Sequence, residues 1–176
     1  MMTGIGAFIT GIAALAVPTT DLARTKACMT EQEAAALFSY ALPEVIETVT
    51  KKCTASLPAA SFLATRGSQL AASYRQISVA HWPLAKSAFF KTLAEDDGDA
   101  DEILAGMPDD ALKGLMGSAL GVVIGKDIKA ENCPRIDSIV SALAPLPPSN
   151  VSSLLVQLIA MAGDTKDNPF KLCPTS

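Results

Sequence analysis

Four cysteines are the residues of this 176-residue chain whose spacing says most about its chemistry. They are Cys28, Cys53, Cys133 and Cys173. Structural zinc sites use cysteines separated by about two to four residues, and a redox-active pair has the Cys-x-x-Cys spacing. Because neither spacing occurs here, the sequence predicts two disulfides. Disulfides persist in oxidising compartments and are rare in the cytosol, so we expect an exported protein.

Thr30 and Glu33 have the spacing of a capping box, so the sequence predicts that a helix begins there. This helix determines which partner Cys28 can reach. Pro43 has no N–H to donate and disfavours helical backbone in the residue before it, so we expect the helix to break or kink there. A second, antiparallel helix over about 44–52 would then bring Cys53 back to Cys28. One unbroken helix would span about 35 Å and keep these two cysteines apart. The sequence therefore predicts a Cys28–Cys53 disulfide.

The same argument applies to the other two cysteines. A helix is expected to open at Cys133, and the prolines of segment 145–148 force a turn into a return helix that ends near Gly163. The tail would then carry Cys173 back to Cys133. The sequence predicts a Cys133–Cys173 disulfide, while four cysteines allow two other connectivities.

The acidic run after residue 94 is the next candidate for chemistry. Asp97, Asp99 and Asp101 alternate like the first three ligands of a calcium-binding loop. Such a loop needs Gly at its sixth position and Glu at its twelfth, where this chain has Glu102 and Pro108. We therefore expect a solvated loop and no metal site here.

The glycines near residue 120 allow two readings. The run 121–127 resembles a phosphate-binding loop, but its glycines are one residue too close and no Ser or Thr follows Lys126. Gly117, Gly121 and Gly125 recur every four residues and share one helix face. We expect a tight helix crossing within the chain, with an exposed interaction seam for a partner's helix as the alternative.

Catalytic side chains are scarce. His81 is the only histidine, so a site with several imidazoles cannot form and a triad would have one available base. The chain contains no Gly-x-Ser-x-Gly elbow and no Ser-x-x-Lys pair. The sequence therefore predicts no catalytic residues, cofactor or metal, although it does not exclude a pair of carboxylates.

The N-terminus has the pattern of a signal peptide. The first 20 residues contain no ionisable side chain. The apolar stretch 4–17 has the length of a signal-peptide core and is short of the roughly 20 residues that a membrane span needs. Ala14-Leu15-Ala16 matches the small-x-small cleavage pattern. We expect residues 1–16 to be a signal peptide and 17–176 to form a single domain.

Two basic residues complicate this prediction. The segment before the apolar core has no Lys or Arg, whereas Arg24 and Lys26 follow it, where positive charge opposes export. An uncleaved membrane anchor and a buried N-terminal helix are therefore the alternatives to a cleaved signal peptide.

The amino-acid composition predicts that the elements which position the cysteines and the other candidate residues are all helices. Hydrophobic residues make up 49% and aromatics only 5%, so the core is built from Ala, Leu, Ile and Val, with little β-type alternation. We expect an all-α fold, a compact bundle of about six to eight short helices, with helical hairpins stapled by the two disulfides. The expected helices cover about 30–42, 44–52, 58–78, 82–93, 108–129, 133–144 and 149–163, with a short one ending near Leu104.

The net charge of the chain and the placement of its basic residues argue against two classes of partner. The net charge is −4 and the basic residues are scattered, which argues against nucleic acids and anionic membranes as partners. The sequence favours a periplasmic or secreted, non-enzymatic protein that binds another protein, such as an inhibitor, an immunity-like factor or an envelope adaptor. The first alternative is a carrier of an apolar ligand, such as a lipid, in a cavity between helices. The second is a carboxylate-dependent enzyme, which would need a buried Asp or Glu with a raised pKa.

Overall fold

The computed structural model describes residues 28–93, 103–163 and 170–174. The described part is all-α, as predicted, with an isolated backbone bridge as its sole extended pairing. The signal peptide predicted at 1–16 and the acidic residues Asp97, Asp99 and Asp101 lie outside the described residues. The α-helices are α1 (Glu31–Cys53), α2 (Phe62–Ser78), α3 (Trp82–Leu93), α5 (Asp109–Asp127), α6 (Cys133–Leu143) and α7 (Pro148–Ala162).

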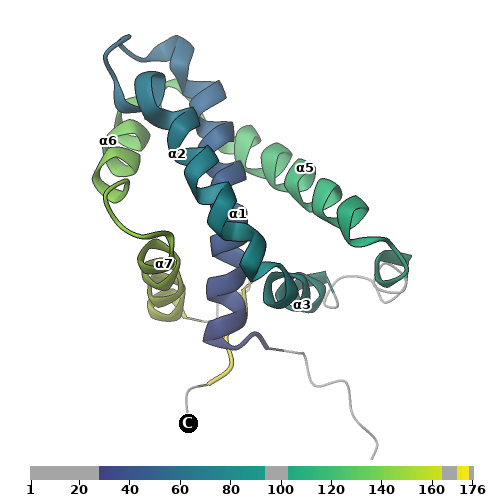
Figure 1. Cartoon of the computed structure of the whole chain (residues 1–176). Helices are drawn as coiled ribbons and strands as arrows, with labels where there is room; N and C mark the ends of the chain where they lie inside the picture. The colour runs from purple at the N-terminus through teal and green to yellow at the C-terminus, as the bar shows by residue number, and fades with distance from the viewer. Residues whose placement is uncertain (1–27, 94–102, 164–169, 175–176) are drawn as a thin grey trace, which may run out of the picture.

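The central element is the 23-residue helix α1. It begins with the capping box expected from the sequence, since the Thr30 hydroxyl accepts from the Glu33 N–H and the Glu33 carboxylate accepts from the Thr30 N–H. Helices α2, α3, α5 and α7 all pack against α1, which runs through the middle of the molecule in Figure 1. Short 3₁₀ turns follow α1 and α2 and precede α6.

The predicted break at Pro43 is wrong. Pro43 lies inside α1 and is fully buried. Its missing N–H costs the helix one hydrogen bond, and a proline in a helix interior costs about 3 kcal/mol. Leu42 and Ile46 on either side join a core cluster with residues of α2 and α7, and burying such side chains contributes about 1.5–3 kcal/mol each. Packing from other helices therefore offsets the local penalty, and the helix continues to Cys53.

The disulfide pairing predicted from the hairpins is consequently also wrong. The four cysteines do form two disulfides, but these are Cys28–Cys173 and Cys53–Cys133. Because α1 is unbroken, Cys28 precedes its first turn and Cys53 ends its last turn, so they lie at opposite ends of the molecule. Neither disulfide staples a local hairpin, and each joins one end of α1 to a distant part of the chain.

The two crosslinks have different surroundings. Cys53 and Cys133 are fully buried among apolar side chains, where the end of α1 meets the start of α6. Cys28 and Cys173 are half-buried. Beside them the C-terminal segment pairs with the chain entering α1: the Met29 N–H donates to the Lys171 carbonyl over 2.8 Å, and the Cys173 N–H donates to the Met29 carbonyl over 2.8 Å.

The remaining helix boundaries follow local signals. Helix α3 spans 82–93 as predicted. Helix α2 begins four residues after Pro58, because the Ser61 hydroxyl caps it by accepting from the Ala64 N–H. Asp137 of α6 also accepts from the Leu63 N–H over 2.7 Å, which ties α6 to the first turn of α2. No helix in the described ranges is long and apolar enough to cross a membrane.

Candidate functional site

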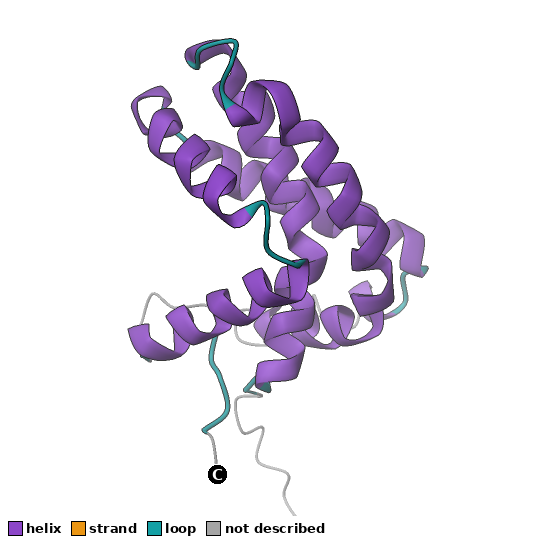
Figure 2. Cartoon of the chain, turned by 60° about the vertical axis from the view of Figure 1, so that its left-hand side comes forward, coloured by secondary structure: helices purple, strands orange, loops and turns teal. Residues whose placement is uncertain are grey.

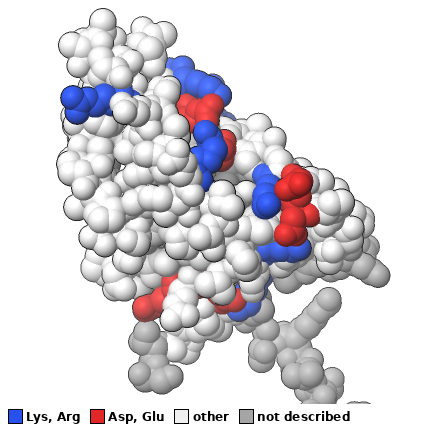
Figure 3. All heavy atoms as spheres, viewed as in Figure 1, with Lys and Arg blue, Asp and Glu red and all other residues white. Residues whose placement is uncertain are grey.

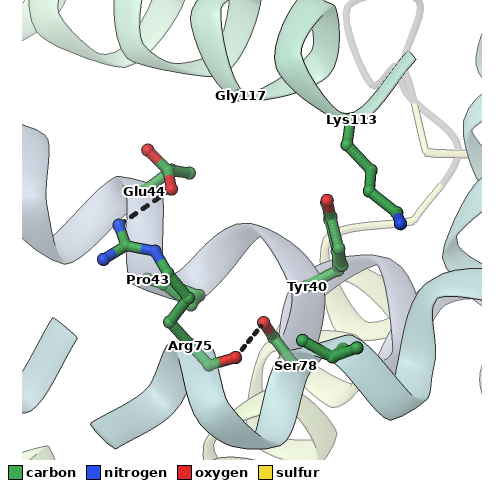
Figure 4. A pocket seen from close by; sticks show the side chains of 8 residues that line it. Tyr40, Pro43, Glu44, Arg75, Ser78, Lys113 and Gly117 are labelled. Atoms are coloured by element: carbon green, nitrogen blue, oxygen red, sulfur yellow. Dashed lines mark hydrogen bonds and ion pairs between the residues drawn. The ribbon is translucent and has the colours of Figure 1, made fainter. Parts of the chain in front are cut away.

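A small cleft between helices is found among the described residues. It lies where α1, the end of α2 and α5 converge, and its volume is about 190 Å³ (Figure 4). Its lining residues are Tyr40, Pro43, Glu44, Arg75, Ser78, Val79, Lys113 and Gly117. Two shallower surface grooves, one between α2 and α6 and one between α1 and α5, have volumes of about 420 Å³ each.

The charged groups of this cleft, named here the Tyr40 cleft, are paired within the protein. The Arg75 guanidinium donates to Glu44 over 2.9 Å and also to Glu47. The Lys113 ammonium lies 3.3 Å from an Asp110 carboxylate oxygen and 5.3 Å from the centre of the Trp82 ring. These contacts satisfy the charged groups without a ligand.

The Tyr40 phenol is the titratable group of this cleft that could act as an acid or base. Its ring packs against Trp82, with the ring centres 5.0 Å apart. Burial, and then the negative charges of Glu44 and Asp110, raise the pKa of Tyr40, so the phenol keeps its proton at neutral pH. A protonated phenol can donate a hydrogen bond but cannot serve as a general base. The cleft therefore shows no acid–base pair.

The described carboxyl groups whose pKa is shifted are shifted downward. Burial by itself would raise the pKa of Glu33, but hydrogen bonds from Lys91, from the Thr30 N–H and hydroxyl, and from Ser87 outweigh it and lower the pKa to about 2. Hydrogen bonds from Lys51 and Arg75 lower the pKa of Glu47. A general acid needs a raised pKa, so these groups give no support to a carboxylate-dependent enzyme.

The Glu33 network makes a prediction about acid stability. Because the pKa of Glu33 is lowered from 4.5 to about 2 on folding, its ionised form stabilises the fold above about pH 4.5. That contribution is lost as the pH falls from about 4.5 toward 2. We expect Glu33→Gln to lower the melting temperature at pH 7 and to flatten its decline between pH 5 and pH 2. Thermal melts at several pH values, with exposed Glu131→Gln as the control, would check this. An unchanged pH profile would show that Glu33 is not the group responsible.

The predicted glycine face lies against α1. A Cβ at Gly117 would be 3.8 Å from Glu44, one at Gly121 would be 3.6 Å from Thr48, and one at Gly125 would be 3.4 Å from Lys52. The three glycines thus let α5 approach α1 within the same chain. This arrangement is the one that the expected intramolecular crossing requires. Gly121 and Gly125 also line the surface groove between α1 and α5, so the exposed-seam alternative stays a prediction.

An uncharged surface covers α7 and the second half of α6. Residues 138–163 contain no Asp, Glu, Lys, Arg or His. In Figure 3 the surface over α7, on the left of the view and below the blue side chains, is white. The exposed large apolar side chains of this segment, with their exposed fractions, are Ile139 (51%), Leu146 (38%), Leu154 (43%), Leu158 (47%) and Met161 (76%).

Helix α7 is held firmly by its other face. Val151, Ser152 and Val156 are buried. The Ser152 hydroxyl donates its one proton to the Pro148 carbonyl over 2.9 Å. The 2.7 Å hydrogen bond between Ser152 and Ser39 of α1 is therefore donated by the Ser39 hydroxyl. With that face fixed on α1, α7 extends away from the bundle in Figure 2 and presents Leu154, Leu158 and Met161 to solvent.

This surface, named here the α7 stripe for Leu154, Leu158 and Met161, is the strongest candidate functional feature. The sequence signal was the charge-free run from 138 to 163, which helical periodicity alone did not single out. In the described ranges, no three His, Cys, Asp or Glu side chains come together as metal ligands. No family model, curated protein or solved structure matches the chain.

Proposed function

We propose that this protein is an exported helical domain that acts by binding protein through the uncharged surface of segment 138–163, without catalysis. The observation that carries this proposal is the α7 stripe. Contiguous exposed apolar surface on a soluble domain marks interaction sites, and the centres of protein interfaces are depleted of charged residues. The stripe has both properties.

The disulfides support the exported location. Both join parts of the chain that are far apart in sequence, by 145 and 80 residues, and no described cysteine is left free. Such long-range crosslinks form and persist in oxidising compartments. Together with the predicted signal peptide at 1–16, they favour the periplasm or the extracellular space. An inhibitor, an immunity-like factor or an envelope adaptor would suit such a domain.

The alternative of an apolar-ligand carrier has weaker support. The Tyr40 cleft, at about 190 Å³, is smaller than the roughly 300–1,000 Å³ of typical ligand pockets. Its lining includes Glu44, Arg75 and Lys113, which are poor neighbours for a lipid chain. The cleft therefore gives the carrier alternative little support.

Site-specific photocrosslinking tests this proposal. A photoreactive amino acid would replace Met161 on the α7 stripe, and a matched control would replace Val122 on α5, since the two residues are 76% and 71% exposed. In the native host, we expect a discrete protein–protein product from position 161 and none from position 122.

Two outcomes would contradict the proposal. The same set of products from both positions would show non-specific contact of exposed apolar side chains. A lipid adduct, or no adduct, at position 161 would remove protein binding at this surface, and the lipid adduct would restore the carrier hypothesis.

A further inference from the structure

We propose that the occupant of the α7 stripe is the α7 stripe of a second copy of this chain, packed antiparallel about a two-fold axis. This inference rests on the proposed function and names its partner. It comes from three properties of the described residues: the spacing of the apolar side chains, the absence of charge, and the kind of polar residues beside them.

The spacing of the stripe is that of a helix-packing seam. Leu154, Leu158 and Met161 are separated by four and then three residues, the spacing that places side chains along one contact line between paired helices. At 1.5 Å per residue the stripe is about 10 Å long. At about 100° per residue it lies roughly a third of a turn from the face that Val151 and Val156 bury against α1. A second helix can therefore reach the stripe without disturbing the fold.

The absence of charge favours a second copy. A two-fold axis places each surface against itself, so any charge near the axis faces a like charge. Helix α7 carries no charged residue, whereas the other described α-helices each carry at least one. The α7 surface is thus well suited to face its own copy.

The polar residues that flank the stripe are uncharged, and the one nearest its centre is self-complementary. Asn150, Ser153 and Gln157 are exposed and lie beside the stripe on the side away from α1. In an antiparallel pair centred on Leu158, Gln157 lies near Gln157 of the second copy, and its amide holds both donors and acceptors, so the two amides can bond to each other. A carboxylate or an ammonium group could not, since each has one role only.

The geometry places Leu158 closest to the axis. It is the middle residue of the stripe, so an antiparallel pair sets Leu158 against its copy and Leu154 against the partner's Met161. The contact is smaller than the roughly 800 Å² per partner of a standard interface, so we expect a weak dimer with a Kd of about 10–100 μM.

Sedimentation equilibrium of the purified, oxidised protein tests this directly. We expect concentration-dependent dimerisation that Leu158→Glu or Leu158→Lys weakens by at least about thirtyfold, because like charges then meet at the axis. Mixing these two variants should restore dimers, since opposite charges would face each other. Val122→Glu, on the exposed face of α5, should dimerise like the wild type. Circular dichroism and melting temperature would confirm that each variant is folded.

Each of the other outcomes overturns the dimer. A wild-type protein that is monomeric at about 1 mM would do so, because the Kd would then exceed the expected range by at least about tenfold. Dimers that persist in Leu158→Glu, or a mixture that fails to restore them, would exclude this packing. If the wild type is monomeric but position 161 crosslinks to a different protein, the inference fails while the proposed function stands. If position 161 crosslinks to no protein, both fail.

Discussion

Replacing Cys53 and Cys133 together by alanine should lower the free energy of unfolding by about 4 to 5 kcal/mol. The disulfide between them closes a loop of 80 residues, and a loop of that size restricts the unfolded chain by about 4.5 kcal/mol in the chain-entropy model. Both sulfur atoms belong to fully buried residues, so the variant also loses packing in the cluster that joins the end of α1 to the start of α6.

Denaturant unfolding of the oxidised wild type and of the double variant would measure this difference. Glu131→Ala serves as the control, because this exposed residue lies two positions from Cys133 and should change stability by less than about 0.5 kcal/mol. Hydrogen exchange should show the largest loss of protection in α6, which this crosslink joins to α1. A loss of stability below about 1 kcal/mol would mean that α6 is positioned by other contacts.

Gly67→Ala should destabilise the protein by about 2 kcal/mol, against the usual effect of replacing glycine in a helix. Alanine is favoured over glycine in a helix interior by about 1 kcal/mol. At Gly67, however, a Cβ would overlap the Thr50 hydroxyl oxygen and lie 3.0 Å from Thr50 Cγ2. Since Thr50 is buried on α1, α1 and α2 would have to move apart, and overpacking of this kind costs about 1–3 kcal/mol or more.

Gly114→Ala is the matched control. Gly114 lies in α5, is exposed, and has no atom within 4 Å of the added Cβ, so this substitution should stabilise the protein by about 0.5–1 kcal/mol. Introducing Gly67→Ala into a Thr50→Ala background should cost less, with a coupling of at least about 1 kcal/mol in the double-mutant cycle. If Gly67→Ala stabilised the protein as Gly114→Ala does, the close α1–α2 crossing would be wrong.

Local signals in the sequence predicted the local features of the fold. The Thr30–Glu33 capping box and the limits of α3 required only short-range chemistry, and both are present. The all-α class followed from composition in the same way. Pro43 misled the prediction because its effect on a helix is local, whereas the packing of Leu42 and Ile46 that outweighs it involves α2 and α7.

The disulfide pairing failed for the same reason. The sequence argument was correct that an unbroken helix would separate Cys28 from Cys53, but only tertiary contacts decided that the helix is unbroken. The sequence analysis did not identify the α7 stripe, and the reason is different. Helix α7 is apolar around much of its circumference, and periodicity shows which positions are apolar but not which of them another helix covers.

The central claim is that this is an exported domain held in shape by two long-range disulfides. Its most direct test is the intact mass of the protein isolated from its native host, measured after alkylation with and without prior reduction. We predict a chain that begins at Val17, with four cysteines that are alkylated only after reduction, and non-reduced peptides that join Cys28 to Cys173 and Cys53 to Cys133. A full-length chain with four reactive thiols would contradict both the location and the crosslinked fold.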